Sequence, residues 1–463
     1  MNGRDVVPIG ISLGLITLTS INGYTLESSI SLGIIAFVIS TTLISWKKRL
    51  AAGVFGLSLA FLLNILPFEY FLKYAHMDII LFLLGMMVVV GYLEEVNYFE
   101  YLVSKLIPRL HGKPKTFYSV LIIITSIFAA IVDEVTAILF TSVIMLELAS
   151  IYKVEPRKFL LPITYAVIIG GTATVMGDPV AILVAFNGGL SMYDFLIWAT
   201  PITALTVVLL ILYTFLFLRN DLGILKEKMD MVDSKEIVEI LSKEARNPRK
   251  ATLIFLGVLI PIMVHGEIAK MLNIFGVEVE PKTILVSIAL MGASYIIAFE
   301  GDFGLRIFLH RVDWQTLFFL MAFFSLVGTL ENVGVLANIT RFMVGVAGGD
   351  DGTLYLLIAL LTAILSPIMD NVLTVATISP IVKELGSLGY NTYPVWFGIL
   401  FSGVFAAIAT PIGTSASLVM MGLLEKRRIK PVNLGEWLKM GLPLAIFTTL
   451  LALFIIYVRS FIL

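Results

Sequence analysis

The chain has 463 residues, 59% of them hydrophobic and 14% charged, with a formal net charge of −1 and no cysteine. Average soluble domains contain about 25% charged residues, so this composition excludes a soluble protein and predicts a polytopic protein in contact with the lipid bilayer. The balanced charge gives no reason to expect nucleic acid as a partner, and the lack of cysteine excludes disulfides and thiolate sites.

Apolar stretches long enough to cross a membrane recur along the whole chain. A spanning helix needs about 20 mostly apolar residues. The N-terminus runs into the first stretch without a signal-peptide cleavage site, so we expect this stretch to be retained as a span. Stretches that fit a single span lie near residues 6–22, 29–46, 51–66, 78–94, 158–188, 195–218, 251–267, 283–299, 314–330, 394–422 and 441–461.

Two further apolar stretches, 116–150 and 353–385, are too long for one span, and acidic residues interrupt each near its middle. We interpret both as re-entrant hairpins, because hairpins keep the short basic clusters of the chain on one side of the membrane. The predicted fold class is all-α, with about 11 transmembrane helices and two re-entrant hairpins. We expect a multi-pass plasma-membrane protein with a cytoplasmic N-terminus and an outside C-terminus. The basic clusters behind this orientation lie at 47–49, 105–115, 153–158 and 426–430.

Matched motifs in the two halves indicate an internal duplication. Asp133 and Asp370, at the centres of the two predicted hairpins, lie 237 positions apart. The motif TVMGD at 174–178 answers TPIGT at 410–414 at an offset of 236. Because five spans lie between the hairpins, the second copy enters from the opposite face, which predicts two inverted-topology repeats.

The duplication predicts four parts of the chain. Residues 1–50 hold N-terminal spans, 51–218 the first repeat, 219–250 a polar cytoplasmic linker, and 251–463 the second repeat. Within the linker, the sequence SKEIVEILSKEA follows Asp233 and is typical of a short, capped amphipathic helix.

Glycine, proline and polar residues interrupt two spans at equivalent places. Residues 170–179, GGTATVMGDP, interrupt the span 158–188, and residues 409–417, ATPIGTSAS, interrupt the span 394–422. Unpaired backbone groups inside a membrane are tolerated only where protein or a watery cavity satisfies them. Each break therefore predicts a polar pocket near the middle of the membrane, as in transporters that work by alternating access.

Acidic residues at the hairpin centres and breaks are candidate ion-binding groups. A charge at the centre of a membrane helix costs roughly 2.5 to 3.5 kcal/mol, so such residues need a functional reason. Neighbouring hydroxyl, amide and carbonyl groups are hard oxygen ligands that suit an alkali cation. We expect no cofactor, and Na⁺ is a candidate bound ion. The predicted residues that bind the substrate or ion are Asp133, Glu134, Thr136, Thr172, Thr174, Gly177, Asp178, Asp370, Asn371, Thr374, Thr410, Gly413, Thr414 and Ser415.

The same residues have structural alternatives. Asp178 precedes Pro179 and could cap the following half-helix, and Asp133 and Asp370 could cap the return arms of the hairpins. Serine and threonine in membrane helices often bond back to their own backbone. Capping and ion binding are compatible.

In these motifs the chain resembles the arsenite-pump and sodium/proton-antiporter group of the ion transporter superfamily, most closely the branch of the P protein of melanosomes. The matching segments read VDEVTAILFT, GGTATVMGDPVA, MDNVLTVAT and GTSASLVMMGLLEK. Glu134 stands where the group has asparagine, and Val180-Ala181 stand where it has Pro-Asn, which adds an acid and removes an amide ligand. The Ser-Asn-Thr pairs of the more distant divalent anion/sodium symporters are missing, which disfavours a carboxylate substrate. The resemblance implies a homodimer, with a dimerising scaffold domain and a moving transport domain.

The leading hypothesis is secondary active transport of a small inorganic ion, coupled to protons or sodium, with cation/proton antiport favoured. Neighbouring carboxylates in a low dielectric can exchange a proton for a cation near neutral pH. We expect no lysine or arginine near either tip except Lys383. Export of arsenite or another small oxyanion or organic anion is the alternative. A passive channel is less favoured, and so is an intramembrane aspartyl protease, because Gly177-Asp178 lacks the earlier glycine of the G-x-G-D motif. The charge asymmetry predicts that proton and cation chemistry centres on the first repeat.

Overall fold

A computed structural model describes residues 3–98, 101, 112–132, 134–231 and 246–463. These residues form helices joined by short connections, and they contain no β-strand. Nine of the described helices are long and apolar enough to cross a membrane, and the bent pair α15–α16 would add a tenth span. The predicted all-α, multi-span membrane fold is confirmed.

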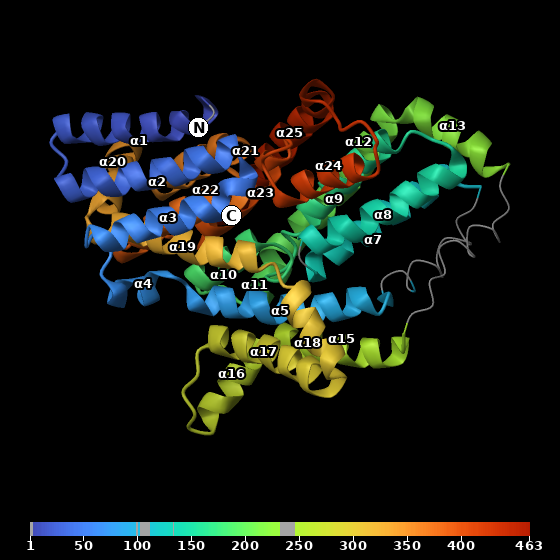
Figure 1. Ribbon diagram of the computed structural model, residues 1–463, viewed down its shortest axis with the longest axis horizontal. Coiled ribbons are helices and arrows are strands. Elements are labelled where there is room, and N and C mark those ends of the chain that lie inside the picture. The colour runs from blue at the N-terminus through green and yellow to red at the C-terminus, as the bar shows by residue number, and fades with distance from the viewer. Residues whose placement is uncertain (1–2, 99–100, 102–111, 133, 232–245) are drawn as a thin grey trace.

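Helices cover the chain in two series, one in each half (Figure 1). The first series is α1 (Gly3–Ile21), α2 (Leu26–Ile44), η1 (Trp46–Lys48), α3 (Arg49–Leu62), α4 (Phe68–Tyr74), α5 (Met77–Glu95), α7 (Pro114–Ile131), α8 (Glu134–Tyr152), α9 (Pro156–Gly170), α10 (Pro179–Gly188), α11 (Met192–Asp194), η3 (Phe195–Ala199), α12 (Thr200–Phe217) and α13 (Arg219–Met229). The second series is α15 (Pro248–Met263), α16 (His265–Ile274), α17 (Pro281–Glu300), α18 (Asp302–His310), α19 (Trp314–Asn332), α20 (Val335–Ala347), α21 (Asp351–Met369), α22 (Asn371–Ser387), α23 (Tyr393–Ala407), α24 (Ser415–Lys426) and α25 (Leu434–Phe461).

Every stretch predicted as a span coincides with one of these helices or with a pair of them. The two long stretches are helical hairpins, α7–α8 and α21–α22, and the two interrupted spans are the broken pairs α9–α10 and α23–α24. The sequence did not predict α4, α18 and α20, because helices of 7 to 13 residues lack the apolar run of a span. The helix predicted after Asp233 lies outside the described residues.

Equivalent helices of the two halves begin at nearly constant offsets. The starts of α5 and α19, α7 and α21, α8 and α22, and α9 and α23 are each 237 positions apart, and those of α10 and α24 are 236 apart. In Figure 1 the hairpin α7–α8 lies to the right of the centre and α21–α22 to the left. Each repeat packs its hairpin against the broken helix of the other repeat: α8 packs on α24, and α22 packs on α10. These features are those of two inverted repeats.

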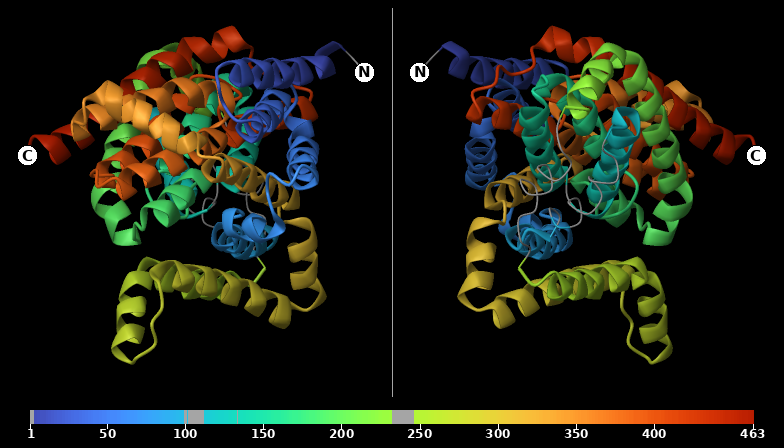
Figure 2. Two further views of the ribbon diagram at one scale, coloured as in Figure 1. Left: turned by 90° about the vertical axis from the view of Figure 1, so that its left-hand side faces the viewer. Right: turned by 90° about the vertical axis from the view of Figure 1, so that its right-hand side faces the viewer.

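The helices pack in two groups. Both hairpins and both broken helices pack together with α12 and α25. In the other group α3 packs on α19 and α5 packs on α17, another contact exchanged between the repeats. An added Cβ on Gly85 of α5 would lie 2.6 Å from the backbone of Ala289 on α17, so glycine permits this close packing. Figure 2 shows α15, α16 and α17 projecting from the rest of the molecule.

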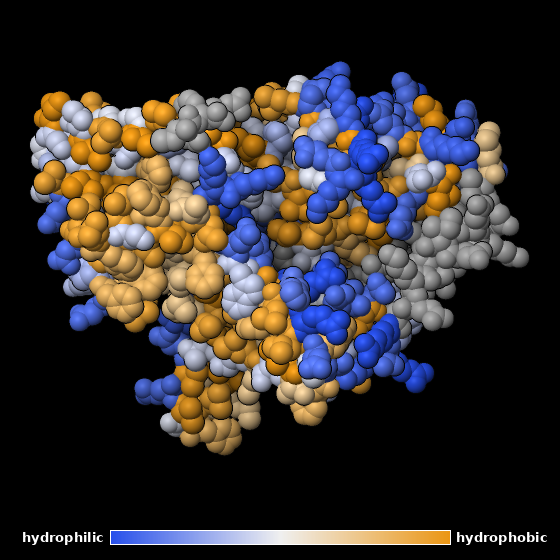
Figure 3. Space-filling view, viewed as in Figure 1, coloured by the Kyte–Doolittle hydropathy of each residue, from blue (hydrophilic) through white to orange (hydrophobic). Residues whose placement is uncertain are grey.

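Large apolar side chains cover much of the outer surface, as a lipid-facing surface requires. Leu62, Leu216 and Phe299 are 80%, 80% and 70% exposed. Figure 3 shows mostly apolar residues over the left half of one face and hydrophilic residues gathered towards the right. Which face of the membrane is cytoplasmic stays a prediction, as does the division of the chain at 219–250.

Candidate functional site

Four helices begin at the centre of the molecule, where the hairpin tips meet the helix breaks. Helix α8 begins at Glu134, α10 at Pro179, α22 at Asn371 and α24 at Ser415. The start of a helix carries a partial positive charge from its unpaired backbone N–H groups. The breaks therefore concentrate positive backbone charge where the sequence places its acidic residues.

Polar side chains cap three of these helix starts. Asp178 Oδ1 accepts a hydrogen bond from the Val180 backbone N–H at 2.5 Å, and Asp370 Oδ1 accepts one from the Val372 N–H at 2.9 Å. At the start of α24, Thr414 Oγ1 accepts from the Ser417 N–H at 3.2 Å. The capping alternative thus holds for Asp178 and Asp370. Asp133 lies outside the described residues.

A hydrogen bond joins the two repeats at the site. Asn371 Nδ2, at the second hairpin tip, donates to Asp178 Oδ2, at the first break, over 3.3 Å. Both side chains are fully buried. The Asn371 backbone N–H also donates to the Gly413 carbonyl at 2.9 Å, which ties the second tip to its own break. Asp178 is therefore part of the first repeat in the sequence, and its side chain bonds to residues of both repeats in the structure.

The predicted threonine ligands are engaged with the backbone in this conformation. Thr174 donates to the Ala130 carbonyl, and Thr410 donates to the Pro367 carbonyl at 2.5 Å. These equivalent bonds tie each break to the hairpin tip of its own repeat. Two further threonines bond back within the chain nearby: Thr172 donates to Ile169 O and contacts Thr203 Oγ1, and Thr374 donates to Asp370 O.

Two glycines allow the breaks to approach neighbouring backbone. A Cβ added to Gly177 would lie 2.4 Å from the Ala129 carbonyl oxygen, and one added to Gly413 would lie 2.3 Å from the Ala407 carbonyl oxygen. Real Cβ atoms do not come this close to backbone oxygen. These two positions hold the breaks in shape and do not supply ligands through side chains.

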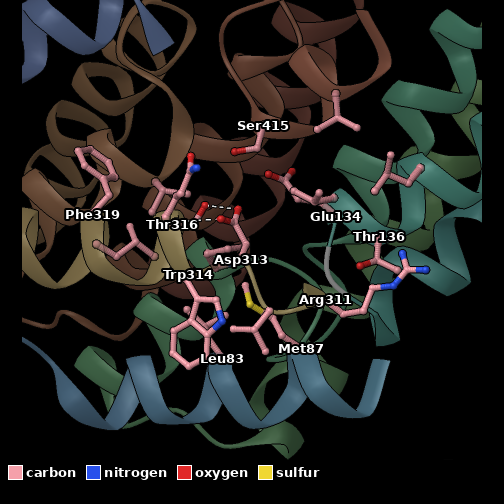
Figure 4. A pocket seen from close by; sticks show the side chains of 18 of the residues that line it. Leu83, Met87, Glu134, Thr136, Arg311, Asp313, Trp314, Thr316, Phe319 and Ser415 are labelled. Carbon is pink, nitrogen blue, oxygen red and sulfur yellow. Dashed lines mark hydrogen bonds between the residues drawn. The ribbon is translucent and has the colours of Figure 1, made fainter. Parts of the chain in front are cut away.

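A cavity of about 630 Å³ opens beside the hairpin tips (Figure 4). Four of the predicted residues line it: Glu134, Thr136, Asp370 and Ser415. Glu134 and Ser415 lie towards each other at one end of the cavity in Figure 4. The opposite wall comes from α3, α5 and α19, so the cavity lies between the two groups of helices.

Two arginines line the same cavity, and sequence reasoning missed both. Arg49 donates to Thr316 Oγ1 at 2.6 Å and lies 3.9 Å from Asp313 Oδ2. Arg311 lies 3.3 Å from Glu94 Oε2 and 3.0 Å from Glu95 Oε2. The expectation that only Lys383 is a basic residue near the tips is therefore wrong, because folding brings Arg49 to the cavity that Asp370 lines. The one available signal was the place of Arg49 at the start of an apolar helix.

Asp370 has an unusual backbone and an unsatisfied side-chain oxygen. Its φ of 75° and ψ of 142° lie where a residue with a side chain is strained, at a cost of roughly 1 to 3 kcal/mol. The side chain is 3% exposed, and Oδ2 has no hydrogen-bond partner among the described residues. A buried carboxylate oxygen without a donor is costly, so this atom is the best candidate for a proton or ion ligand.

Inverted repeats, two hairpins, two broken helices and a polar cavity at their meeting point define a multi-pass membrane transporter. The family model described as citrate transporter matches residues 30–300 and 271–462. The chain therefore belongs to the citrate transporter family.

Transporters and membrane proteins of several organisms are similar to this chain. An uncharacterized transporter of Mycobacterium tuberculosis is 28% identical over 389 residues, covering 83% of this chain and 87% of that protein. The 46 kDa membrane protein of Mycobacterium leprae is 27% identical over 390 residues, covering 82% of this chain and 86% of that protein. The human P protein is 22% identical over 431 residues, covering 79% of this chain and 51% of the P protein.

The crystal structure of the Alcanivorax borkumensis YdaH transporter, which is described as revealing an unusual topology, shares this fold. Its TM-score is 0.51 at 15% identity, over 84% of this chain and 86% of that chain. The similarity to the P protein agrees with the resemblance noted in the sequence. Membership of the narrower arsenite-pump and sodium/proton-antiporter group stays a prediction.

Proposed function

We propose that this transporter exchanges a small cation for protons by alternating access. The observation that carries the proposal is the buried Asp370 carboxylate, with its unpartnered Oδ2, at the meeting point of the two repeats. A carboxylate in this position can hold either a proton or a cation, and competition between the two produces antiport.

The charges around the cavity favour a cation. Each helix start contributes about half a positive charge, so the four starts together contribute roughly two. Three described carboxylates, Glu134, Asp178 and Asp370, lie at these starts. The Arg49 charge faces Asp313, and the Arg311 charge faces Glu94 and Glu95. Before the arginines are counted, the balance at the helix starts is about one negative charge, which Arg49, a proton or a monovalent cation would neutralise.

Oxygen atoms from several sources would have to complete a cation site. Among the residues that the structure describes, no three acidic or histidine side chains converge as metal ligands. Na⁺ accepts hydroxyl and carbonyl oxygens, and a hydroxyl that donates its proton keeps lone pairs for a cation. Ser415 and Thr136, which line the same cavity, are the hydroxyl candidates to add to Asp370.

Proteoliposomes with imposed gradients test the exchange directly. A sodium gradient should drive proton movement, and a proton gradient should drive ²²Na⁺ uptake, in wild-type protein but not in Asp370→Asn. Asp133→Asn tests the corresponding acid of the first tip. Absence of both fluxes in wild-type protein, together with a melting temperature that does not respond to sodium, would rule out cation antiport.

Transport of an anion is the second candidate, and two observations favour it. Arg49 lines the cavity with Asp370, and four positive helix starts point towards the same region. The matching family model is also described as a citrate transporter. Uptake of radiolabelled citrate tests this candidate in the same proteoliposomes, and uptake of arsenite, which is uncharged near neutral pH, tests the arsenite alternative. Cation exchange predicts accumulation of neither compound.

A further inference from the structure

Arg49 is a charged residue held in an apolar setting at the first turn of α3. Its side chain is 12% exposed, and its guanidinium stacks 3.9 Å from the centre of the Trp46 ring. It also donates to Thr316 and lies near Asp313, both on or just before α19. Placing a largely buried arginine beside a membrane span costs free energy. The rule that basic residues mark the cytoplasmic side does not explain why this one is buried.

The Arg49 charge acts across the boundary between the two groups of helices. Asp313 belongs with Arg49 to the α3–α19 group, whereas Asp370 belongs to the hairpin group. The carboxylates of Asp370 and Asp313 both attract the guanidinium. Asp178 at the start of α10 and Glu134 at the start of α8 are the acidic groups nearest in the fold. The same cavity is also lined by Glu94, Asp313 and a second arginine, Arg311. Arg311 is paired with Glu94 and Glu95, so Arg49 is the arginine of this cavity whose attraction reaches the Asp370 carboxylate.

We propose that Arg49 is the internal counter-ion of Asp370, holding the empty, charged hairpin tip in the present arrangement until a bound cation or proton releases it. This inference takes the identity of the transported ion from the proposed function. It concerns how ion binding at the same site controls movement of the hairpin tip. Ligand binding can shift a conformational equilibrium only through a difference in interaction between the two states. Here the difference is the attraction between Arg49 and Asp370, which exists in this arrangement and disappears when Asp370 is neutralised.

This counter-ion would enforce exchange. In an antiporter the empty carrier must not return, because its return lets the cargo flow without the counter-flow. Attraction to Arg49 opposes movement of the tip only while Asp370 is charged and empty. When Asp370 has bound a proton or a cation, this attraction is lost and the hairpin tip can move. Arg49 is therefore a positioning residue that sets coupling and does not itself bind the cargo.

The absence of cysteine permits a distance measurement that does not depend on the cargo. Spin labels at Leu62→Cys on α3 and Leu388→Cys at the end of α22 report one position in each group, and these leucines are 80% and 50% exposed. In sodium-free buffer at alkaline pH, the wild-type pair should mainly show the distance of the present arrangement. Arg49→Gln should lower the ratio of this population to any other by about five-fold or more, the size of a typical coupling between sites.

Matched variants show whether Arg49 acts through Asp370. Asp370→Asn should lower the same population ratio, and adding Arg49→Gln to it should cause no further change. Arg49→Lys should retain most of the wild-type population, and Lys47→Gln, which removes an exposed charge two residues away, should leave it unchanged. The inference is overturned if Asp370→Asn leaves the populations as in wild type, whether or not Arg49→Gln folds. It is also overturned if the two substitutions act additively.

Flux measurements separate this inference from the proposed function. Arg49→Gln should raise sodium efflux into a sodium-free alkaline buffer, where protons are scarce, by about five-fold or more while exchange falls. If wild-type protein exchanges no cation but the distances respond to Arg49 and Asp370 as described, the proposed function fails and the counter-ion stands. If exchange occurs and the distances ignore both substitutions, the counter-ion fails and the function stands.

Discussion

The two hairpin tips occupy equivalent places in the fold but carry different chemistry. The second tip has Asp370 with its unpartnered Oδ2, followed by Asn371, which reaches across to Asp178. The first tip has Glu134, which faces the cavity near Ser415. Both Asp178 oxygens accept hydrogen bonds, from Val180 and from Asn371. Among the described residues this comparison favours Asp370 as a centre of ion chemistry. The expectation that this chemistry centres on the first repeat stays a prediction, because Asp133 lies outside the described residues.

Neutralising Asp370 should have the largest effect. Asparagine tolerates a positive φ, so Asp370→Asn should keep the backbone and remove only the charge. Loss of a charged ligand worth roughly 3 kcal/mol corresponds to a loss of about 100-fold in coupled exchange. Proton-driven ²²Na⁺ uptake measures the change. A larger loss for Glu134→Gln than for Asp370→Asn would return the centre of the site to the first repeat.

Exchanging the two partners of the hydrogen bond between the repeats should have a smaller net effect. Asn371→Asp alone places two carboxylates together in a buried site and should lower exchange by about 100-fold. The double variant Asp178→Asn with Asn371→Asp restores one acid and one amide. We expect it to recover at least about ten-fold over the single variant in the same flux assay. No recovery would mean that each repeat needs its own residue at that place.

The two helix breaks should respond alike to an added methyl group, despite their different side chains. Gly177→Ala and Gly413→Ala each force a Cβ against a backbone carbonyl and should destabilise by about 1 to 3 kcal/mol. Thermal unfolding in detergent measures this loss. Gly422→Ala on α24 is the control, since its Cβ would meet no atom within 4 Å. A stable Gly413→Ala protein beside an unstable Gly177→Ala protein would show that the breaks are not equivalent.

The smallest effects should come from substitutions in two polar contacts between the repeats. Tyr393 donates to Asp194 at 2.7 Å, and Arg157 lies 3.5 Å from Glu436. Asp194 and Glu436 each complete a capping box at equivalent helix starts. Tyr393→Phe should cost about 1 kcal/mol in thermal stability, and Arg157→Gln less than that because Glu436 is 46% exposed. Equal losses of thermal stability would indicate that the two contacts are equally shielded from water.

Local signals in the sequence predicted the fold well. The predicted breaks at 170–179 and 409–417 overlap the observed ones, because Gly170, Pro179 and the Thr414 cap act through neighbouring backbone atoms. The hairpins also followed from a local rule, since an apolar run too long for one span has to reverse direction, and both runs do so at their acidic residues. Whether each hairpin turns inside the membrane stays a prediction. The repeat offset of 237 then related each element to its partner.

Contacts between distant segments could not be predicted. Arg49 and Asp370 are 321 positions apart, and only the packing of α3 on α19 and the entry of the second hairpin bring them to one cavity. The hydroxyl groups illustrate a second limit. Thr174 and Thr410 were predicted as ligands from their residue type, but their donors are used by carbonyls of the hairpin tips. A residue type indicates which bonds a side chain can make, and packing decides which partner it meets.

The hydrogen bond from Asn371 to Asp178 has a consequence for how such a protein could arise. Two identical half-length chains, inserted in opposite orientations and related by a two-fold axis, would carry the same pair of residues at both junctions of tip and break. In the present chain one junction holds an amide and a carboxylate, while the other brings Glu134 towards the start of α24. Joining the halves into one gene product made this division of labour possible, because each half could then change without altering its twin.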